Sequence, residues 1–204
     1  MQVEQEVKTA QTIQILKTSK PFVGYCFFGV CPQTVLCYIK LEGYKKLQES
    51  MQLTTLCFLI REGEILLAMK KRGFGVGKWN GVGGKLKDGE SIEAAAVREM
   101  EEEIGVSADL NQLENIGSLK FFFQGKPDWD QHMHIYFVRN WQGEPRESEE
   151  MKPQWYRYGE LPFDSMWCDD KHWLPTVLRG NKIEGEFHFN PDGTDFDRYK
   201  IQQI

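Results

Sequence analysis

The sequence has no surplus of basic residues and no paired cysteine motif. Its 204 residues carry 25 Lys and Arg against 30 Asp and Glu, which gives a formal net charge of −5. Proteins that bind duplex nucleic acid usually show a basic footprint, so this kind of partner is disfavoured. The five cysteines form no C-x-x-C pair, which favours free thiols in a reducing compartment. With no internal repeat and no low-complexity tract, one globular domain with room for an extension is expected.

Residues 1–50 differ in composition from the rest of the chain. Residues 1–20 are polar, and Pro21 to Ile39 contains no charged residue, which is long enough to raise the question of a membrane span. Glycine, proline and polar residues interrupt this stretch. A secretory signal fits poorly, because the polar lead is long, it carries acids, and no A-x-A-like cleavage site follows. We expect a poorly ordered N-terminal extension, with a membrane or targeting segment and a structured addition as alternatives. Met51 is a candidate alternative start.

The remainder, residues 51–204, alternates short β-rich runs with two helical segments. Strands are expected at Leu53–Ile60, Glu64–Met69, Ile116–Gln124, His132–Asn140, Gln154–Tyr158, Ile183–Asn190 and Asp195–Gln202. Helices are expected at Ser91–Ile104 and Asp169–Leu178, and a glycine-rich loop at Lys70–Gly84. The pattern indicates the α/β class, with a mixed β-sheet covered by helices.

The first predicted helix has clear start and stop signals and one apolar stripe. Ser91 can cap its first turn, and Gly105 can end it. At 100° per residue, Val97, Met100 and Ile104 share one face, so this face is expected to bury against the sheet.

A second stripe of the same helix is acidic. Glu99 lies three and four residues before Glu102 and Glu103, so the three carboxylates are neighbours on the helix surface. Like charges at this spacing repel each other, unless a cation lies between them. A hard divalent cation is one interpretation, and a solvated acidic face is the other.

The spacing around these acids decides between the two interpretations. It consists of Gly84, five residues, Glu90, seven residues, Arg98-Glu99-Met100, one residue, Glu102-Glu103, one residue and Gly105-Val106. Seven fixed positions of this kind match by chance on the order of 10⁻⁹ to 10⁻⁸ per start. The stretch resembles the signature box of the Nudix hydrolases, G-x5-E-x7-R-E-U-x-E-E-x-G-U, where U is apolar.

The resemblance implies the Nudix fold, a mixed sheet sandwiched between helices, and metal-assisted hydrolysis of a nucleoside diphosphate linked to another group. It implies Mg²⁺ as the cofactor, with Mn²⁺ as an alternative. The implied metal site consists of Gly83, Glu99, Glu102, Glu103 and Glu150. Glu103 or a neighbour would also orient or deprotonate the attacking water, and Arg98 would pair with Glu90.

Three segments outside the box resemble one branch of this family, the animal hydrolases of oxidised purine nucleoside triphosphates. They are Met69–Lys85, Glu149–Tyr156 and Leu161–Pro175. The resemblance implies a purine pocket formed by Thr55, Lys70, Phe74, Asn80, Phe121, Met151, Trp167, Asp169, Asp170 and Phe189. Cys168 stands where that branch usually has proline, which should alter the stiffness of the backbone slightly.

The residues of this pocket also have less specific interpretations. An Asp-Asp pair at a helix start is often a cap, Trp167 and Trp173 could be plain core aromatics, and Lys70-Lys71-Arg72 could be a solvated patch. If Asp169 and Asp170 are both buried, their titrations should couple, so that one donates while the other accepts. Such a pair could match several oxidised purines. The four histidines show no ligand spacing matched to the acids.

The function expected from these features is hydrolysis of oxidised purine nucleoside triphosphates, such as 8-oxo-dGTP and 2-hydroxy-dATP, to monophosphate and pyrophosphate. Such an enzyme would remove damaged nucleotides before they enter DNA. A Nudix hydrolase of another nucleoside diphosphate derivative and an inactive nucleotide-binding module are the alternatives. We expect a cytoplasmic monomer that acts on small molecules without a nucleic-acid or membrane partner. The nucleus and the mitochondrion are further candidate compartments.

Overall fold

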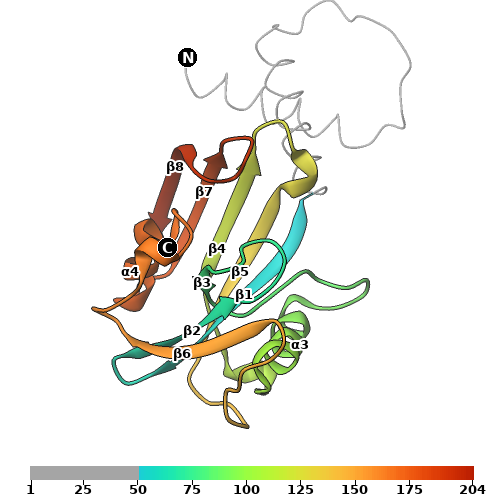
Figure 1. The fold of residues 1–204 in the computed structure, drawn as a ribbon, viewed down its shortest axis with the longest axis vertical. Helices are drawn as coiled ribbons and strands as arrows, with labels where there is room; N and C mark the ends of the chain where they lie inside the picture. Colours follow the sequence, from blue (N-terminus) through green and yellow to red (C-terminus); the bar gives the residue numbers. More distant parts are fainter. Residues whose placement is uncertain (1–50) are drawn as a thin grey trace, which may run out of the picture. The chain divides into compact units, whose positions relative to one another are not determined.

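A computed structural model describes residues 51–204 of the protein (Figure 1). The extension predicted over residues 1–50 lies outside the described residues. The strands are β1 (Gln52–Arg61), β2 (Glu64–Lys70), β3 (Trp79–Asn80), β4 (Leu113–Phe123), β5 (Gln131–Val138), β6 (Met151–Arg157), β7 (Ile183–Phe189) and β8 (Phe196–Gln203). The helices are α3 (Ile92–Ile104) and α4 (Asp170–Leu178), with short 3₁₀ turns at η1 (Leu110–Gln112), η2 (Pro127–Trp129) and η3 (Phe163–Ser165). Neither α-helix has the length and apolar character needed to cross a membrane.

The described strands form one mixed sheet. Its order is β3-β2-β1-β5-β4-β7-β8, and β6 pairs with β2 outside this path. The pairs β1–β5 and β4–β7 are parallel, whereas β4–β5, β7–β8 and the pairs made by β2 are antiparallel. The parallel pairs bring the starts of β1 and β5 together, and the candidate site is built over these strand ends.

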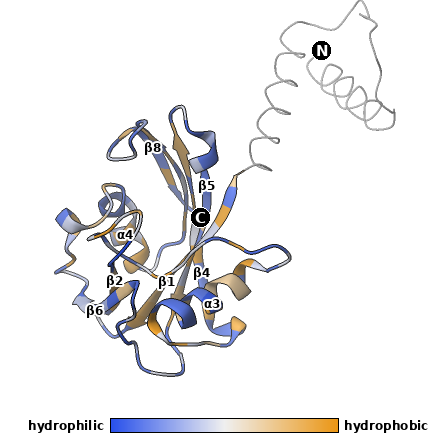
Figure 2. Cartoon of the chain, turned by 45° about the vertical axis from the view of Figure 1, so that its right-hand side comes forward, coloured by the Kyte–Doolittle hydropathy of each residue, from blue (hydrophilic) through white to orange (hydrophobic). Residues whose placement is uncertain are grey.

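The two helices lie on different sides of the strands (Figures 1 and 2). Successive residues of β1 point to opposite faces, so Phe58 belongs to one apolar cluster and Leu59 to the other. The Phe58 cluster includes Trp173 of α4, and the Leu59 cluster includes Met100 of α3. Burial of both faces explains why β1 is an almost continuous apolar run, and it confirms the predicted α/β class.

Helix α3 begins and ends where its sequence predicts. The Ser91 hydroxyl accepts a hydrogen bond from the Ala94 N–H at 3.1 Å. Gly105 ends the helix with φ of 73°, a left-handed conformation that suits glycine, and its N–H donates to the Glu101 carbonyl. Met100 and Ile104 are fully buried, as expected from the apolar stripe.

Several predicted boundaries are wrong: β4 begins at Leu113 rather than at Ile116, and β5 ends at Val138 rather than at Asn140. Two further differences involve β2. The loop expected at Lys70–Gly84 contains strand β3, in which Asn80 pairs with Ala68 of β2. Strand β6 begins at Met151 rather than at Gln154, because β2 offers a pairing edge along its whole length, from Glu64 opposite Arg157 to Lys70 opposite Met151. Both strands depend on pairing with β2, and this pairing is not visible in their own sequences.

Candidate active site

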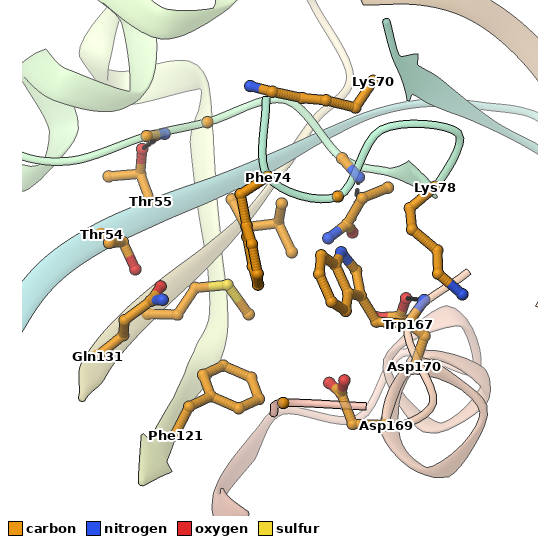
Figure 3. A pocket seen from close by; sticks show the side chains of 18 of the residues that line it. Thr54, Thr55, Lys70, Phe74, Lys78, Phe121, Gln131, Trp167, Asp169 and Asp170 are labelled. Carbon is orange, nitrogen blue, oxygen red and sulfur yellow. Dashed lines mark hydrogen bonds between the residues drawn. The ribbon is translucent and has the colours of Figure 1, made fainter. Parts of the chain in front are cut away.

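A cavity of about 290 Å³ lies on the α4 side of the sheet, over β1, β4 and β5 (Figure 3). All ten residues predicted to contact the substrate line it: Thr55, Lys70, Phe74, Asn80, Phe121, Met151, Trp167, Asp169, Asp170 and Phe189. Gly83, in the loop that precedes α3, lines the same cavity. The space therefore extends from Asp169 and Asp170 to the loop before the helix that carries the box.

Three polar side chains form one end of this cavity. Asp169 Oδ2 accepts from Trp173 Nε1 at 3.1 Å, and Asp170 Oδ2 accepts from the Trp167 N–H at 3.0 Å. Asn80 Oδ1 accepts from the Gly81 N–H at 2.8 Å, which leaves its amide nitrogen to donate elsewhere. Asp169 occupies the N-cap position of α4 but makes no capping hydrogen bond, so the cap interpretation is wrong for this side chain.

The buried position of the two aspartates favours their neutral forms. Asp169 is 4% exposed and Asp170 1% exposed. Burial raises the pKa of Asp169 to about 6, although the Trp173 hydrogen bond opposes the shift. Burial and the neighbouring Asp169 raise the pKa of Asp170 well above its ordinary value. The pair can therefore hold a proton near neutral pH and present one donor and one acceptor.

The two tryptophans of this region have different surroundings. Trp173 is fully buried in the core beside Phe58, at 6.2 Å between ring centroids. Trp167 lies in the cavity wall, where Phe74 stacks on it at 5.2 Å. The core interpretation is therefore right for Trp173 and wrong for Trp167, whose indole can stack on a planar ligand.

Glu103 connects the box helix to the cavity. It is 6% exposed, and its Oε2 accepts from the Gly83 N–H at 3.0 Å. Lys70 Nζ lies 3.6 Å from its Oε1. Burial raises the pKa of Glu103 to about 7, while the Gly83 hydrogen bond and Lys70 oppose the shift. A carboxyl group with this pKa can accept a proton near neutral pH.

Arg98 organises the other acids of the box. It bonds Glu90 at 2.8 Å and Glu99 at 2.6 Å, and it lies 3.3 Å from Glu102. The hydrogen bond from Arg98 is the main cause that lowers the pKa of Glu90 to about 2. The predicted Arg98–Glu90 pair is therefore present. A side chain at Gly84 would place its Cβ 2.5 Å from the Glu99 carboxylate, so that carboxylate would have to move.

The basic segment Lys70-Lys71-Arg72 lies among acids. Lys70 lies between Glu103 and Glu150, at 3.6 and 3.9 Å. Arg72 bonds Glu150, and Lys71 bonds Glu147 at 2.7 Å. Lys71 and Arg72 are exposed, so the segment is a solvated surface whose ion pairs face the start of β6, and only Lys70 lines the cavity.

The acids suit a divalent cation in chemistry but are not gathered around one. Glu99, Glu102, Glu103 and Glu150 supply carboxylate oxygens, the donors that hard cations prefer. Within residues 51–204, however, no three acidic, His or Cys side chains converge in a ready metal cluster. Arg98 and Lys70 balance these carboxylates instead. A bound cation would therefore replace Arg98 and Lys70 as the partner of these carboxylates.

The cavity also includes residues that sequence reasoning missed. They are Thr54, Lys78, Phe123, Gln131 and Met133, among others. Thr54 and Leu56 line the cavity from alternate positions of β1, and Gln131 and Met133 do so from alternate positions of β5. Thr55, between Thr54 and Leu56, lines the cavity as well, so the alternation of a strand could not by itself have identified these residues.

Known proteins resemble this chain in sequence and in fold. An oxidized purine nucleoside triphosphate hydrolase of Danio rerio is 47% identical over 138 residues, which covers 68% of this chain and 86% of that protein. The Mus musculus protein of the same name is 43% identical over 153 residues, which covers 75% of this chain and 96% of that protein. The mutator MutT protein from Bacillus halodurans matches with a TM-score of 0.63 and 27% identity, over 74% of this chain and 98% of its own. Residues 51–177 match the NUDIX domain. The family predicted from the box is thus confirmed, and the chain belongs to the NUDIX domain family.

Proposed function

We propose that this protein hydrolyses oxidised purine nucleoside triphosphates, such as 8-oxo-dGTP and 2-hydroxy-dATP, to the monophosphate and pyrophosphate. One observation carries the proposal: Asn80 and the buried Asp169–Asp170 pair line the same cavity as Lys70 and Gly83. A nucleotide can therefore place its base at the aspartate pair and direct its phosphates towards Lys70 and Gly83. The names and the 43–47% identity of the zebrafish and mouse relatives support this choice.

The base end would bind the purine by stacking and by hydrogen bonds. Trp167 and Phe74 supply flat apolar surface for the ring. Asn80 donates or accepts at the edge of the base, and the aspartate pair does both because it can hold a proton. The position of that proton can change with the base, so one pocket can accept oxidised guanine and oxidised adenine.

The phosphate end would hold a divalent cation, as Nudix hydrolases generally do. We propose Mg²⁺, with Mn²⁺ as the alternative, bound by Glu99, Glu102, Glu103, Glu150 and the backbone of Gly83. The bound ion would neutralise phosphate charge and lower the pKa of water. Glu102 is 54% exposed at its side chain, so it can turn towards an ion without leaving a packed position.

The chain's own residues would handle the reacting water and the triphosphate. Lys70 attracts the negative phosphates towards the mouth of the cavity. Glu103 takes the proton of the water that attacks the β-phosphorus. The bond from that phosphorus to the oxygen of the α-phosphate breaks, which releases the monophosphate and pyrophosphate. Arg98 positions Glu99 and joins the helix to Glu90.

The substrates proposed here are free nucleotides. We therefore propose a monomer that needs neither a nucleic-acid nor a membrane partner. It would act on the nucleotide pool of the cytoplasm, and the nucleus and the mitochondrion are further places where damaged nucleotides threaten DNA.

One incubation tests the proposal. The full chain with Mg²⁺ is given 8-oxo-dGTP, 2-hydroxy-dATP, dGTP or ADP-ribose, and the products are separated and identified. Monophosphate and pyrophosphate from the oxidised purines, formed faster than from dGTP, are the expected result. Turnover of ADP-ribose alone would indicate another Nudix substrate, and no turnover would indicate a binding module. Glu103→Gln is the matched control, because it keeps the shape of the side chain and removes its basicity.

A further inference from the structure

Thr54 places an unpaired hydroxyl in the wall of the cavity. It is 6% exposed and lines the cavity from β1 (Figure 3). Thr54 Oγ1 and His132 Nε2 are the two buried side-chain atoms of residues 51–204 that have no hydrogen-bond partner. A buried polar group left unpaired costs about 1–3 kcal/mol. An unpaired group in a ligand cavity suggests that the ligand completes its hydrogen bonding.

Gln131 lies at the same end of the cavity as Thr54. Figure 3 shows both side chains across the cavity from Asp169 and Asp170. The Gln131 amide forms no side-chain hydrogen bond to another residue of the part of the chain that the structure describes. Primary amides carry two donors and an acceptor, so this side chain is free to bind a ligand.

The backbone around Gln131 is held firmly. Gln131 lies between Gln52 of β1 and Phe121 of β4. The preceding residue, Asp130, accepts from the Phe123 N–H at 2.8 Å through its side chain and from the Gln52 N–H at 3.0 Å through its carbonyl. The amide therefore projects from a fixed strand position, as a residue that recognises a ligand should.

The cavity thus has two polar ends with an apolar middle. Phe121, Met133 and Phe189 line the space together with the polar groups of both ends. A purine held at Asn80 and the aspartates by the edge of its six-membered ring would direct its five-membered ring towards the opposite end. Thr54 and Gln131 are the uncharged polar side chains there.

The chemistry of this pair matches an oxidised five-membered ring. Oxidation at C8 replaces a C–H with a carbonyl oxygen and places a hydrogen on N7, which creates an adjacent acceptor and donor. A primary amide can donate to the first and accept from the second at once. An undamaged purine offers only the N7 acceptor at this edge. We propose that Gln131 and Thr54 recognise the C8=O and N7–H of 8-oxopurines, an inference that rests on the proposed purine substrate.

The test compares two substrates that carry their extra oxygen on different rings. The variants are Gln131→Met and Thr54→Val, which keep size and remove hydrogen bonding, and Thr54→Ser is the matched control that keeps the hydroxyl. The expected result for each of the first two is a roughly tenfold loss of kcat/KM for 8-oxo-dGTP, as for one hydrogen bond. 2-Hydroxy-dATP, which is oxidised on the six-membered ring, should lose less than about threefold. Thr54→Ser should keep the selectivity of the wild type.

Binding of the products gives a second measurement that does not depend on catalysis. Titration calorimetry with 8-oxo-dGMP and dGMP should show that Gln131→Met removes most of the preference for the oxidised base. Equal losses for all nucleotides, or no change in selectivity, would overturn the inference. A loss seen only with ribonucleotides would overturn it too, because the pair would then contact the sugar. If the wild-type protein turns over no oxidised purine, the proposed function itself is refuted. If the wild type is active but the variants keep its selectivity, only this inference is refuted.

Discussion

The candidate site has carboxylates at its box end, around α3, and at its base end, around Asp169 and Asp170, but their charged neighbours differ. At the box end, Glu90 and Glu99 lie against Arg98, and Glu103 and Glu150 lie near Lys70. At the base end, Asp169 and Asp170 are adjacent and almost fully buried, and neither forms an ion pair within residues 51–204.

The difference shows how one residue type can serve two purposes. At the box end, the hydrogen bond from Arg98 lowers the pKa of Glu90 and keeps that carboxyl charged. Burial, in contrast, raises the pKa of Glu103 to about 7, although Lys70 lies nearby.

Asp169 and Asp170 are buried side by side without an ion pair in the described residues, and the charge of Lys78 only partly offsets the effect of burial on Asp170. The pair can therefore hold a proton, so it can donate as well as accept. The surroundings of each carboxyl, rather than its residue type, determine whether it is charged or can donate a hydrogen bond.

Glu103→Gln should produce the largest effect and should affect the box end alone. We expect kcat for 8-oxo-dGTP to fall by about 10³-fold, because the variant loses the base and a charged oxygen ligand. The affinity for 8-oxo-dGMP should stay close to that of the wild type, since the base end is unchanged. Pyrophosphate release and calorimetry measure the two effects. Turnover close to the wild-type rate would exclude Glu103 from the reaction.

Asp169→Ala and Asp170→Ala should weaken substrate binding at the base end rather than the chemical step at the box end. Each should raise KM for both 8-oxo-dGTP and 2-hydroxy-dATP by about 10- to 100-fold, the usual cost of a hydrogen bond that involves a charged group. Steady-state kinetics with both substrates measures the change. Asn at the same position is the control for shape. Unchanged KM values would remove the aspartates from the purine pocket.

The pH dependence of stability should reveal the proton held by the aspartates. The pKa of Asp169 rises on folding from about 4 to about 6, so the folded state binds more protons than the unfolded state within this window. Its contribution to stability is therefore complete below about pH 4 and is lost as the pH rises through about 6.

Asp169→Asn removes one titrating group of the coupled pair and also relieves the effect of Asp169 on Asp170, while its amide oxygen can still accept from Trp173. Denaturant unfolding of both proteins between pH 4 and pH 8 should show a wild type that loses stability relative to the variant as the pH rises. A constant difference between the two proteins across this range would contradict a raised pKa at Asp169.

Gly75→Ala should have the smallest effect and should disturb only the base end. Its Cβ would lie 2.7 Å from Trp167 Cζ2, so the loop or the indole must shift. We expect KM for 8-oxo-dGTP to rise a few-fold, because the loop can relieve part of the overpacking. Gly73→Ala is a matched control: Gly73 has a similar φ of +78°, and a Cβ there meets nothing within 4 Å. Equal effects of the two substitutions would show that backbone strain, rather than contact with Trp167, is responsible.

Much of the fold was predictable from local patterns. Ser91, Gly105 and the apolar stripe between them define α3 from its own sequence. The short strand at Trp79–Asn80 was not predictable, because its hydrogen-bond partners belong to β2. Elements with local signals were found, and elements that exist only by pairing with a distant strand were missed.

The residues of the candidate site also fall into a predicted group and a missed group. The motif resemblance identified ten of the residues that line the cavity. It did not indicate Thr54 and Gln131, which belong to the same wall but to no motif.

The sequence by itself determined the family, the box spacing, the acidic stripe and the adjacency of Asp169 and Asp170. Only the tertiary structure decided which of these acids are buried. Glu102 and Glu103 are neighbours on one helix, yet the side chain of Glu102 is 54% exposed, while Glu103 is buried under the Gly83 loop. The reason is that burial and nearby charges, on which the pKa of an acid depends, are both set by segments far away in the chain.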